Sequence, residues 1–216
     1  MSRAVRNNGA HKRAEKHSTK PAVKRVPKRA AKRAPGAAAE PRLSHRRPPA
    51  AMPVPDWQRA LRRQFGREQD FEMENIGTHP VFSEFRVHNP ASGGRYRVAI
   101  RGTQPGENYC ACADFATNAL GTCKHIEYTL ARLAAKRTGK AALARGYAPP
   151  FSEVFLHYGV QRTVRFRAGT ECRPTVKTAA ERLFDAETGW VLPPTRLAAL
   201  DDFIVAAHAT GHELRV

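Results

Sequence analysis

Long hydrophobic runs are missing from this 216-residue sequence. No stretch approaches the ~20 consecutive apolar residues that cross a bilayer, and the first residues lack the apolar core of a secretory signal. An arginine-rich start is typical of organelle transit peptides, but Pro21, Pro27 and Pro35 would interrupt the amphipathic helix that such a peptide forms. We therefore expect a cytoplasmic protein with no membrane partner.

Acidic residues are scarce at the N-terminal end. Through Ala50 the chain has fifteen lysines and arginines against two acids, which accounts for +13 of the formal net charge of +18. Large apolar side chains are also rare there, so burial cannot offset the entropy lost on ordering. We therefore predict that residues 1–55 form a disordered basic tail.

Basic pairs recur between the prolines of this tail, a pattern suited to neutralising phosphates with strong salt dependence and little sequence preference. We predict that the tail contacts nucleic acid, most simply DNA. The residues assigned to this contact are Lys24, Arg25, Lys28, Arg29, Lys32 and Arg33. A tail that only keeps the protein in solution remains an open alternative.

Residues 56–140 have the pattern of a small α+β module. The spacing of large apolar residues predicts a helix that begins at Asp56 and ends at Gly66. A second helix is predicted over residues 123–136, capped by Thr122. Alternating apolar and polar residues between the two helices predict a small antiparallel sheet. Its strands are residues 71–74, 81–88 and 95–101.

Residues 141–216 are predicted to form a separate α+β extension, whose end is expected to be incomplete. Residues 137–150 are dense in Gly, Pro and positive charge and indicate a connector. Beyond it, the patterns predict a hairpin and two helices. These are residues 152–169, 174–185 and 193–212.

Cysteines are few, but three of the four lie close to a histidine in the sequence. The pattern is C-x-C-x10-C-x-H, formed by Cys110, Cys112, Cys123 and His125. The first two are expected at the end of a strand and in a tight turn, and the last two in the first turn of a helix, whose dipole favours thiolate. Three thiolates and one imidazole complete a tetrahedral Zn²⁺ set, so the ion would hold structure and leave no position for a reactive water.

Three other roles of these cysteines remain open, although zinc is favoured. A disulfide would leave one of the three thiols unpaired and is opposed by a reducing compartment. The cysteines could also be buried thiols of a core. An iron–sulfur cluster usually takes four cysteines, which this window does not supply. Cys172 is far from the window in sequence and is interpreted as a lone thiol.

The string "CACADFATNALGTCKH" resembles the SWIM zinc finger, whose pattern is C-x-C-xn-C-x-H. The stretches "HPVFSEFRVHNPASGGRYRVAIRG" and "FSEVFLHYGVQRTVRFRAGTECRP" resemble the region that precedes the motor of bacterial Swi/Snf-type helicases. The resemblance covers about residues 56–216. It implies a zinc-binding module that serves DNA binding or targeting, with a helicase motor or another protein as its partner.

The chain itself is predicted not to be an enzyme. A phosphate-binding loop of the form G-x-x-x-x-G-K-[ST] is missing, because the nearest string has Ala134 in place of the first glycine and Ala141 in place of the Ser or Thr. Whether the chain is a fragment, is encoded apart from its motor or acts alone stays open. A protein-interaction adaptor with no nucleic-acid role is the alternative function.

A few residues outside the cysteine–histidine pattern also carry local signals. His208 and His212 lack the glutamate of a zinc-protease motif and are predicted to be surface histidines. Asp114 is interpreted as a turn residue and Phe115 as a core anchor. A basic strand face beside the finger either contacts nucleic acid backbone or is merely solvated. It comprises Arg95, Arg97 and Arg101.

Overall fold

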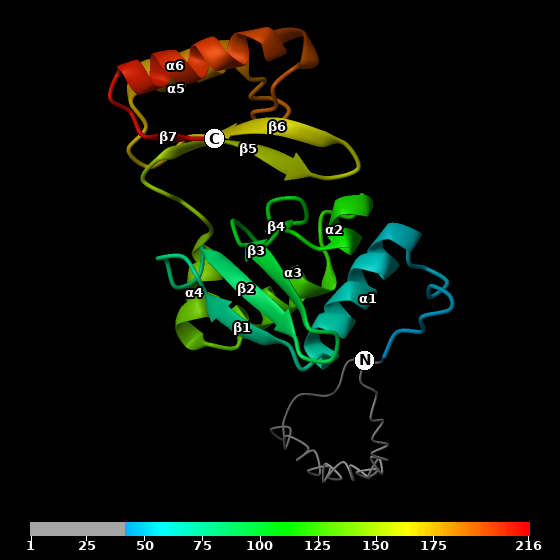
Figure 1. Cartoon of the computed structure of the whole chain (residues 1–216). Coiled ribbons are helices and arrows are strands. Elements are labelled where there is room, and N and C mark those ends of the chain that lie inside the picture. Colours follow the sequence, from blue (N-terminus) through cyan, green and yellow to red (C-terminus); the bar gives the residue numbers. More distant parts are fainter. Residues whose placement is uncertain (1–41) are drawn as a thin grey trace, which may run out of the picture. The chain divides into compact units, whose positions relative to one another are not determined.

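The computed structural model describes residues 42–216 (Figure 1). The tail predicted for residues 1–55 therefore lies largely outside the described residues, as do all six of its predicted nucleic-acid contacts. Residues 42–53 have no regular secondary structure but contact the first helix, where the Leu43 N–H donates to Gln64 Oε1 at 2.8 Å. Trp57 Nε1 donates to the Ser44 carbonyl at 3.0 Å.

Groups of strands and groups of helices follow one another along the described chain. The helices are α1 (Val54–Glu68), α2 (Ala113–Thr117), α3 (Lys124–Ala134), α4 (Arg137–Arg145), α5 (Pro174–Leu183), the 3₁₀ helix η1 (Pro194–Ala199) and α6 (Leu200–Ala209). The strands are β1 (Glu72–Asn75), β2 (Glu84–Asn89), β3 (Gly94–Ala99), β4 (Tyr109–Cys110), β5 (Ser152–Tyr158), β6 (Arg162–Arg167) and β7 (Leu214–Arg215). Among the described residues, no helix has both the length and the apolar character needed to cross a membrane.

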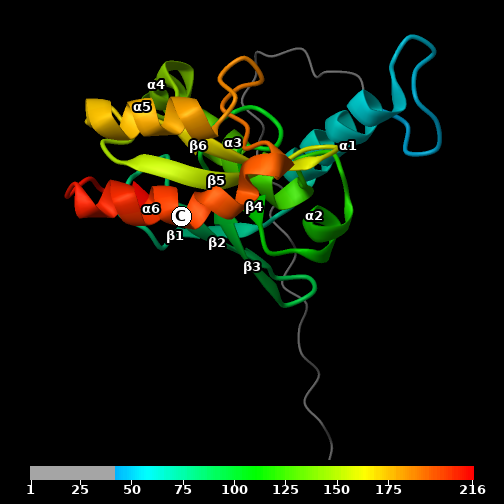
Figure 2. The ribbon, with the colours of Figure 1, turned by 90° about the horizontal axis from the view of Figure 1, so that it is seen from above.

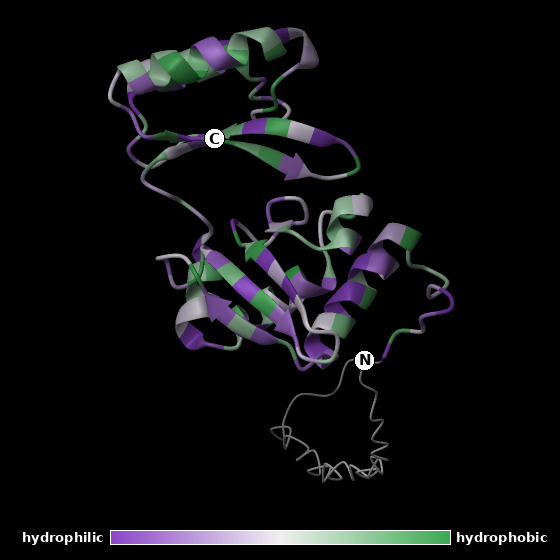
Figure 3. Cartoon of the chain, viewed as in Figure 1, coloured by the Kyte–Doolittle hydropathy of each residue, from purple (hydrophilic) through white to green (hydrophobic). Residues whose placement is uncertain are grey.

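The first sheet is antiparallel, with the strand order β1-β2-β3-β4. In its register Phe85 lies opposite Val98, and Val87 lies opposite Tyr96. Phe85, Val87 and Val98 are buried, while the residues between them alternate to the other face, as the colours of β2 and β3 show (Figure 3). The small antiparallel sheet predicted from the sequence is confirmed, with β4 as an additional short strand.

Helix α1 is longer than predicted, and the prediction that Gly66 ends it is wrong. The helix begins at Val54, where prolines suit the first turn, and runs past Gly66 to Glu68. Gly66 is buried because α1 crosses α3 there: a Cβ at this position would lie 2.7 Å from the backbone nitrogen of Tyr128. The glycine therefore permits a close helix crossing instead of ending the helix.

The prediction of a connector over residues 137–150 is also wrong in part, because residues 137–145 form α4. Ala142 is buried in the first core and Leu143 packs against it. Alanine is the strongest helix former, and this propensity outweighs the glycine and the positive charge. Helix α3 begins at Lys124 with Cys123 as its N-cap, whereas Thr122, the predicted cap, donates its hydroxyl to Glu127 Oε1 at 2.8 Å.

The C-terminal part contains a second sheet with the order β6-β5-β7. Helices α5 and α6 lie side by side on one of its faces (Figures 1 and 2) and share a second core with it. The predicted hairpin and the helix from Pro174 are confirmed. The last predicted helix is split into η1 and α6, and β7, which pairs parallel to β5, was not predicted.

The two C-terminal histidines hold β7 in place. His208 Nε2 lies 2.8 Å from the Leu214 carbonyl oxygen, and His212 Nε2 lies 2.9 Å from Ser152 Oγ. His212 is buried, so its prediction as a surface residue is wrong. Its burial follows from the pairing of β7 with β5, which brings residues 60 positions apart together.

Candidate metal centre

The four predicted ligands come from three elements that meet at one edge of the first sheet. Cys110 ends β4, and Cys112 is the N-cap of α2. Cys123 is the N-cap of α3, and His125 is in the first turn of that helix. Both N-cap cysteines have extended backbones, but only the Cys112 side chain accepts a hydrogen bond from its helix end.

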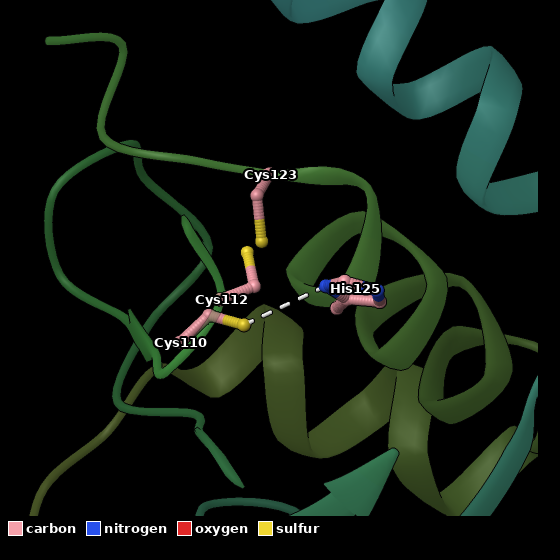
Figure 4. Close-up of side chains that lie close together, drawn as sticks. All are labelled: Cys110, Cys112, Cys123 and His125. Carbon is pink, nitrogen blue, oxygen red and sulfur yellow. Dashed lines mark hydrogen bonds between the residues drawn. The ribbon is translucent and has the colours of Figure 1, made fainter. Parts of the chain in front are cut away.

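The four side chains form one compact group (Figure 4). All four residues are buried, and their possible ligand atoms lie within 4.8 Å of one another. Cys110 Sγ and His125 Nδ1 are 3.7 Å apart. The four cysteines of the chain are all free thiols, so no disulfide competes for these sulfurs. A buried Cys3His group of this kind could hold a metal ion.

A buried asparagine shapes the turn that delivers Cys110. Asn108 Oδ1 accepts hydrogen bonds from the backbone N–H groups of Arg101 at 2.7 Å and Gly102 at 3.1 Å. Its Nδ2 donates to the Gly102 carbonyl at 3.0 Å. The side chain thus replaces a partner strand at the point where β3 turns back into β4. Sequence reasoning missed Asn108, whose only signal was an asparagine within a turn-rich segment.

The ring of His125 is fixed by aromatic neighbours. It stacks on Tyr96, with ring centroids 4.4 Å apart, and lies 5.1 Å from the ring of Phe71. Nδ1 faces the sulfurs, whereas Nε2 is buried with no hydrogen-bond partner among the described residues. A buried polar group without a partner costs about 1–3 kcal/mol. Coordination of a cation by Nδ1 would offset this cost.

The three thiols influence one another's ionisation. Hydrogen bonds from Cys110 and Cys123 lower the pKa of Cys112. Hydrogen bonding with Cys112 raises the pKa of Cys110 to about 12, hydrogen bonding with Cys110 raises the pKa of Cys123, and burial adds to both increases. Three thiolates therefore repel one another here unless a cation lies among them, because a dication stabilises every thiolate at once.

The N-terminal end of α2 contributes a hydrogen bond to one sulfur of the Cys3His group. The backbone N–H of Phe115 donates to Cys112 Sγ at 3.4 Å, which favours the thiolate. Phe115 itself is buried against the rings of Tyr109 and Tyr158, and its prediction as a core anchor is confirmed.

Helix α1 braces the loop that carries the ligands. Arg62 forms a two-pronged ion pair with Asp114, in which Nη2 and Nε lie 2.5 and 3.1 Å from the two carboxylate oxygens. Asp114 is thus more than the turn residue predicted, because it links α2 to α1.

Two more arginines of α1 reach the same region: Arg59 donates to the Leu120 carbonyl at 3.1 Å, and Arg63 lies 3.3 Å from a Glu127 carboxylate oxygen. Sequence reasoning missed this brace. Its signal was the i, i+3, i+4 spacing of Arg59, Arg62 and Arg63, which places them on one face of a helix.

The predicted basic strand face is balanced by acids. Arg95 and Arg97 are exposed on β3, but Arg97 lies 3.5 Å from Glu84. Neighbouring residues on the same face form two further polar contacts across β1 and β2. Arg86 pairs with Glu74 at 2.8 Å, and His88 Nδ1 lies 2.9 Å from a Glu72 carboxylate oxygen. This surface is therefore a solvated face of mixed charge, and it is not predominantly basic.

Arg101 does not belong to that face, so the prediction of three arginines along one strand is wrong. Strand β3 ends at Ala99, and Arg101 donates to the carbonyls of Ile100 and Ser83. Its Nε lies 3.8 Å from Glu153 Oε1, at the start of the second sheet. The loss of the strand register after Ala99 explains the different direction of the side chain. Binding of nucleic acid by Arg95, Arg97 or Arg101 stays a prediction.

Comparison of the chain with models of protein families, with curated proteins and with solved structures finds no match.

Proposed function

We propose that Cys110, Cys112, Cys123 and His125 bind one structural Zn²⁺ ion. The observation that carries this proposal is the buried, closed Cys3His group whose ligand atoms lie within 4.8 Å of one another. Tetrahedral zinc with Zn–S near 2.3 Å and Zn–N near 2.0 Å separates sulfur from nitrogen by about 3.6 Å. The 3.7 Å between Cys110 Sγ and His125 Nδ1 fits this separation.

The ion's role in this proposal is to join three elements. It links the end of β4 to the first turns of α2 and α3, and with four protein ligands it has no open position for substrate. The resemblance of the ligand string to SWIM fingers supports a binding module instead of an enzyme. The function proposed is a DNA-binding or targeting accessory module, beside a Swi/Snf-type motor, with the basic tail supplying affinity for phosphates.

Metal content is the first test. Purified full-length protein is expected to contain about one zinc per chain by elemental analysis, and cobalt substitution should give the intense thiolate-to-metal absorption of a tetrahedral site. Iron and sulfide in place of zinc would contradict this proposal and indicate an iron–sulfur cluster. A metal content near zero in protein that remains folded in EDTA would end it.

Salt dependence is the test of the DNA role. Each neutralised phosphate contributes about −0.9 to the slope of log affinity against log salt for duplex DNA, so the full chain should bind a labelled duplex with a steep slope that becomes shallow when the tail is removed. An anisotropy titration measures both. Binding of a protein partner after nuclease treatment, without affinity for DNA, would instead indicate an adaptor.

A further inference from the structure

The positive charge of the chain beyond its tail is concentrated in one segment. Residues 51–216 carry twenty-two lysines and arginines against seventeen acids, a net charge of +5. Residues 128–152 contain no acid and five cations, so the rest of 51–216 is balanced at seventeen of each sign. The five are Arg132, Lys136, Arg137, Lys140 and Arg145. The charge excess therefore lies on α4, at its N-cap Lys136 and in the last turn of α3.

The contacts of these five cations differ from those of the arginines on α1. Within residues 42–216, none of the five forms an ion pair, whereas Arg59, Arg62 and Arg63 on α1 each contact a carboxylate. All five are exposed. Unpaired cations repel one another unless an anion binds between them, and the sheet face that was predicted to attract phosphates is already neutralised by its own acids.

A cavity of about 780 Å³ lies beside the C-terminal end of α4. It is lined by the loop between β1 and β2, by the linker from α4 to β5, and by Arg215 near the end of the chain. Its volume is within the range of about 300–1,000 Å³ that is typical of ligand pockets. Arg145, the last residue of α4, also lines the cavity, so α4 places one of the five cations at its wall.

Aromatic rings form part of the cavity lining. Phe82, Tyr147 and Phe151 are each half-buried, and the rings of Phe82 and Tyr147 lie 5.2 Å apart. The guanidinium of Arg215 stacks on Phe151 at 3.3 Å from the ring centroid. Half-buried rings beside arginines are the surface on which bases of a single strand stack while its phosphates are neutralised.

The charge of the lining favours an anion. Three arginines line the cavity, whereas Glu84 is the only acid of its lining and lies 3.5 Å from Arg97. Of these arginines, Arg101 lies 3.8 Å from Glu153 and Arg215 lies 2.7 Å from Glu213, so Arg145 is the one without an acidic partner in this lining. A neighbouring cavity of about 630 Å³ shares Glu84, Arg101 and Arg215 with the first. Its lining adds two more acids, Glu107 and Glu153, and no further arginine, so it suits a polyanion less well.

We propose that this cavity and α4 together bind single-stranded nucleic acid. One base enters the cavity against Phe82, Tyr147 and Phe151, and the neighbouring phosphates lie on Arg145 and on the cations of α4. The inference rests on the proposed nucleic-acid role and gives it a second site, apart from the tail. A free nucleotide has the same chemistry as one unit of the strand, and the experiment below distinguishes them.

Photocrosslinking of the full chain to a short oligothymidylate that carries one 5-iodouracil tests the site. The crosslink is expected in the tryptic peptide 146–162, which contains Tyr147 and Phe151. Crosslinks confined to other peptides would overturn the proposal. Free thymidine monophosphate should compete at least about tenfold more weakly than the oligonucleotide, because in the cavity it reaches Arg145 but not the other α4 cations. Equal or stronger competition would contradict binding of a strand and favour a small nucleotide as the ligand.

Charge reversal gives the matched comparison. Arg145→Glu and Lys140→Glu should each weaken binding of the oligonucleotide several-fold at low salt and reduce the salt slope by about 1, while Lys177→Glu, on the exposed face of α5, should change neither. If all three variants weakened binding equally, the effect would reflect the net charge of the protein alone and would contradict a site at this cavity. Steep salt dependence with no crosslink at 146–162 would exclude binding at the cavity. The proposed role of the tail would then still stand.

Discussion

At the scale of single residues, the metal centre depends on backbone position as much as on ligand chemistry. Cys112 and Cys123 are N-caps, and the Cys112 side chain accepts a hydrogen bond from its helix end. His125 lies in the first turn of α3, with its ring held by Tyr96 and Phe71. Because the pKa of each of the three thiols depends on the other two, removal of one sulfur changes the ionisation of the others.

Loss of one ligand should therefore unfold the first part of the chain. Zinc contributes an apparent ~10–16 kcal/mol in small finger peptides, and we expect Cys123→Ser and His125→Ala to lose zinc and most of their thermal stability. Circular dichroism with metal analysis measures both. Cys172→Ser is the control, because this half-exposed thiol lies outside the ligand group. A Cys123→Ser protein as stable as the parent would contradict a structural role.

Gly66 offers a second residue-scale prediction. Alanine normally stabilises a helix relative to glycine by about 1 kcal/mol, but here its Cβ would meet the backbone of α3 at 2.7 and 2.9 Å. We expect Gly66→Ala to destabilise the protein by about 1–3 kcal/mol, as overpacking does, in chemical denaturation. Gly159→Ala, with no contact closer than 3.5 Å, should be nearly neutral. A stabilised Gly66→Ala variant would mean that α1 and α3 can move apart.

At the scale of elements, α1 determines how firmly the ligand loop is held. The helix contacts α3 through Gly66 and reaches the loop through the polar groups of Arg59, Arg62 and Arg63. Each of these arginines is paired with a carboxylate. Helix α1 therefore supplies packing and polar contacts that hold the loop.

The Arg62–Asp114 pair allows a test of this brace. The pair is two-pronged and its arginine is mostly buried, but Asp114 is 39% exposed, so solvent screening limits its contribution to about 1–2 kcal/mol. Arg62→Ala should lower stability by that amount and speed zinc transfer to a chelator. Arg42→Ala, which breaks an exposed pair with Glu68, should cost under about 1 kcal/mol. Equal effects of the two variants would argue against a brace.

At the scale of the whole described chain, two hydrophobic cores are joined by a buried carboxylate. Glu153, in β5, accepts a hydrogen bond from Tyr147 at 2.8 Å and pairs with Arg167 at 2.8 Å, with Arg101 at 3.8 Å on the other side. Burial, followed by the charge of Glu153, raises the pKa of Tyr147, so its phenol stays a donor. The network connects the end of the first sheet to the start of the second.

Removal of this carboxylate should weaken the connection. Breaking a buried ion pair by removing one partner costs about 3–5 kcal/mol, and we expect Glu153→Ala to lose about this amount and to unfold in two calorimetric steps, one for each core. Glu213→Ala removes an exposed pair with Arg215 and should leave one cooperative transition. A single, unshifted transition in Glu153→Ala would show that the cores are coupled by other contacts.

Local pattern was sufficient to predict much of this protein. The C-x-C-x10-C-x-H spacing, the alternation along β2 and β3, and the apolar stripe of α3 are short-range signals, and each corresponds to a feature of the structure. They succeed because helix and strand periodicity and ligand type depend on residues close in the chain.

Contacts between distant residues required the tertiary structure. Three features depend on residues 52 to 62 positions apart: the helix crossing at Gly66, the contact of Arg101 with Glu153, and the contact of Arg62 with Asp114. No periodicity encodes such pairings, because they arise from how the elements pack. The sequence therefore specifies the donors of a metal site, whereas packing decides that they converge, what braces them and where the unpaired charge is left exposed.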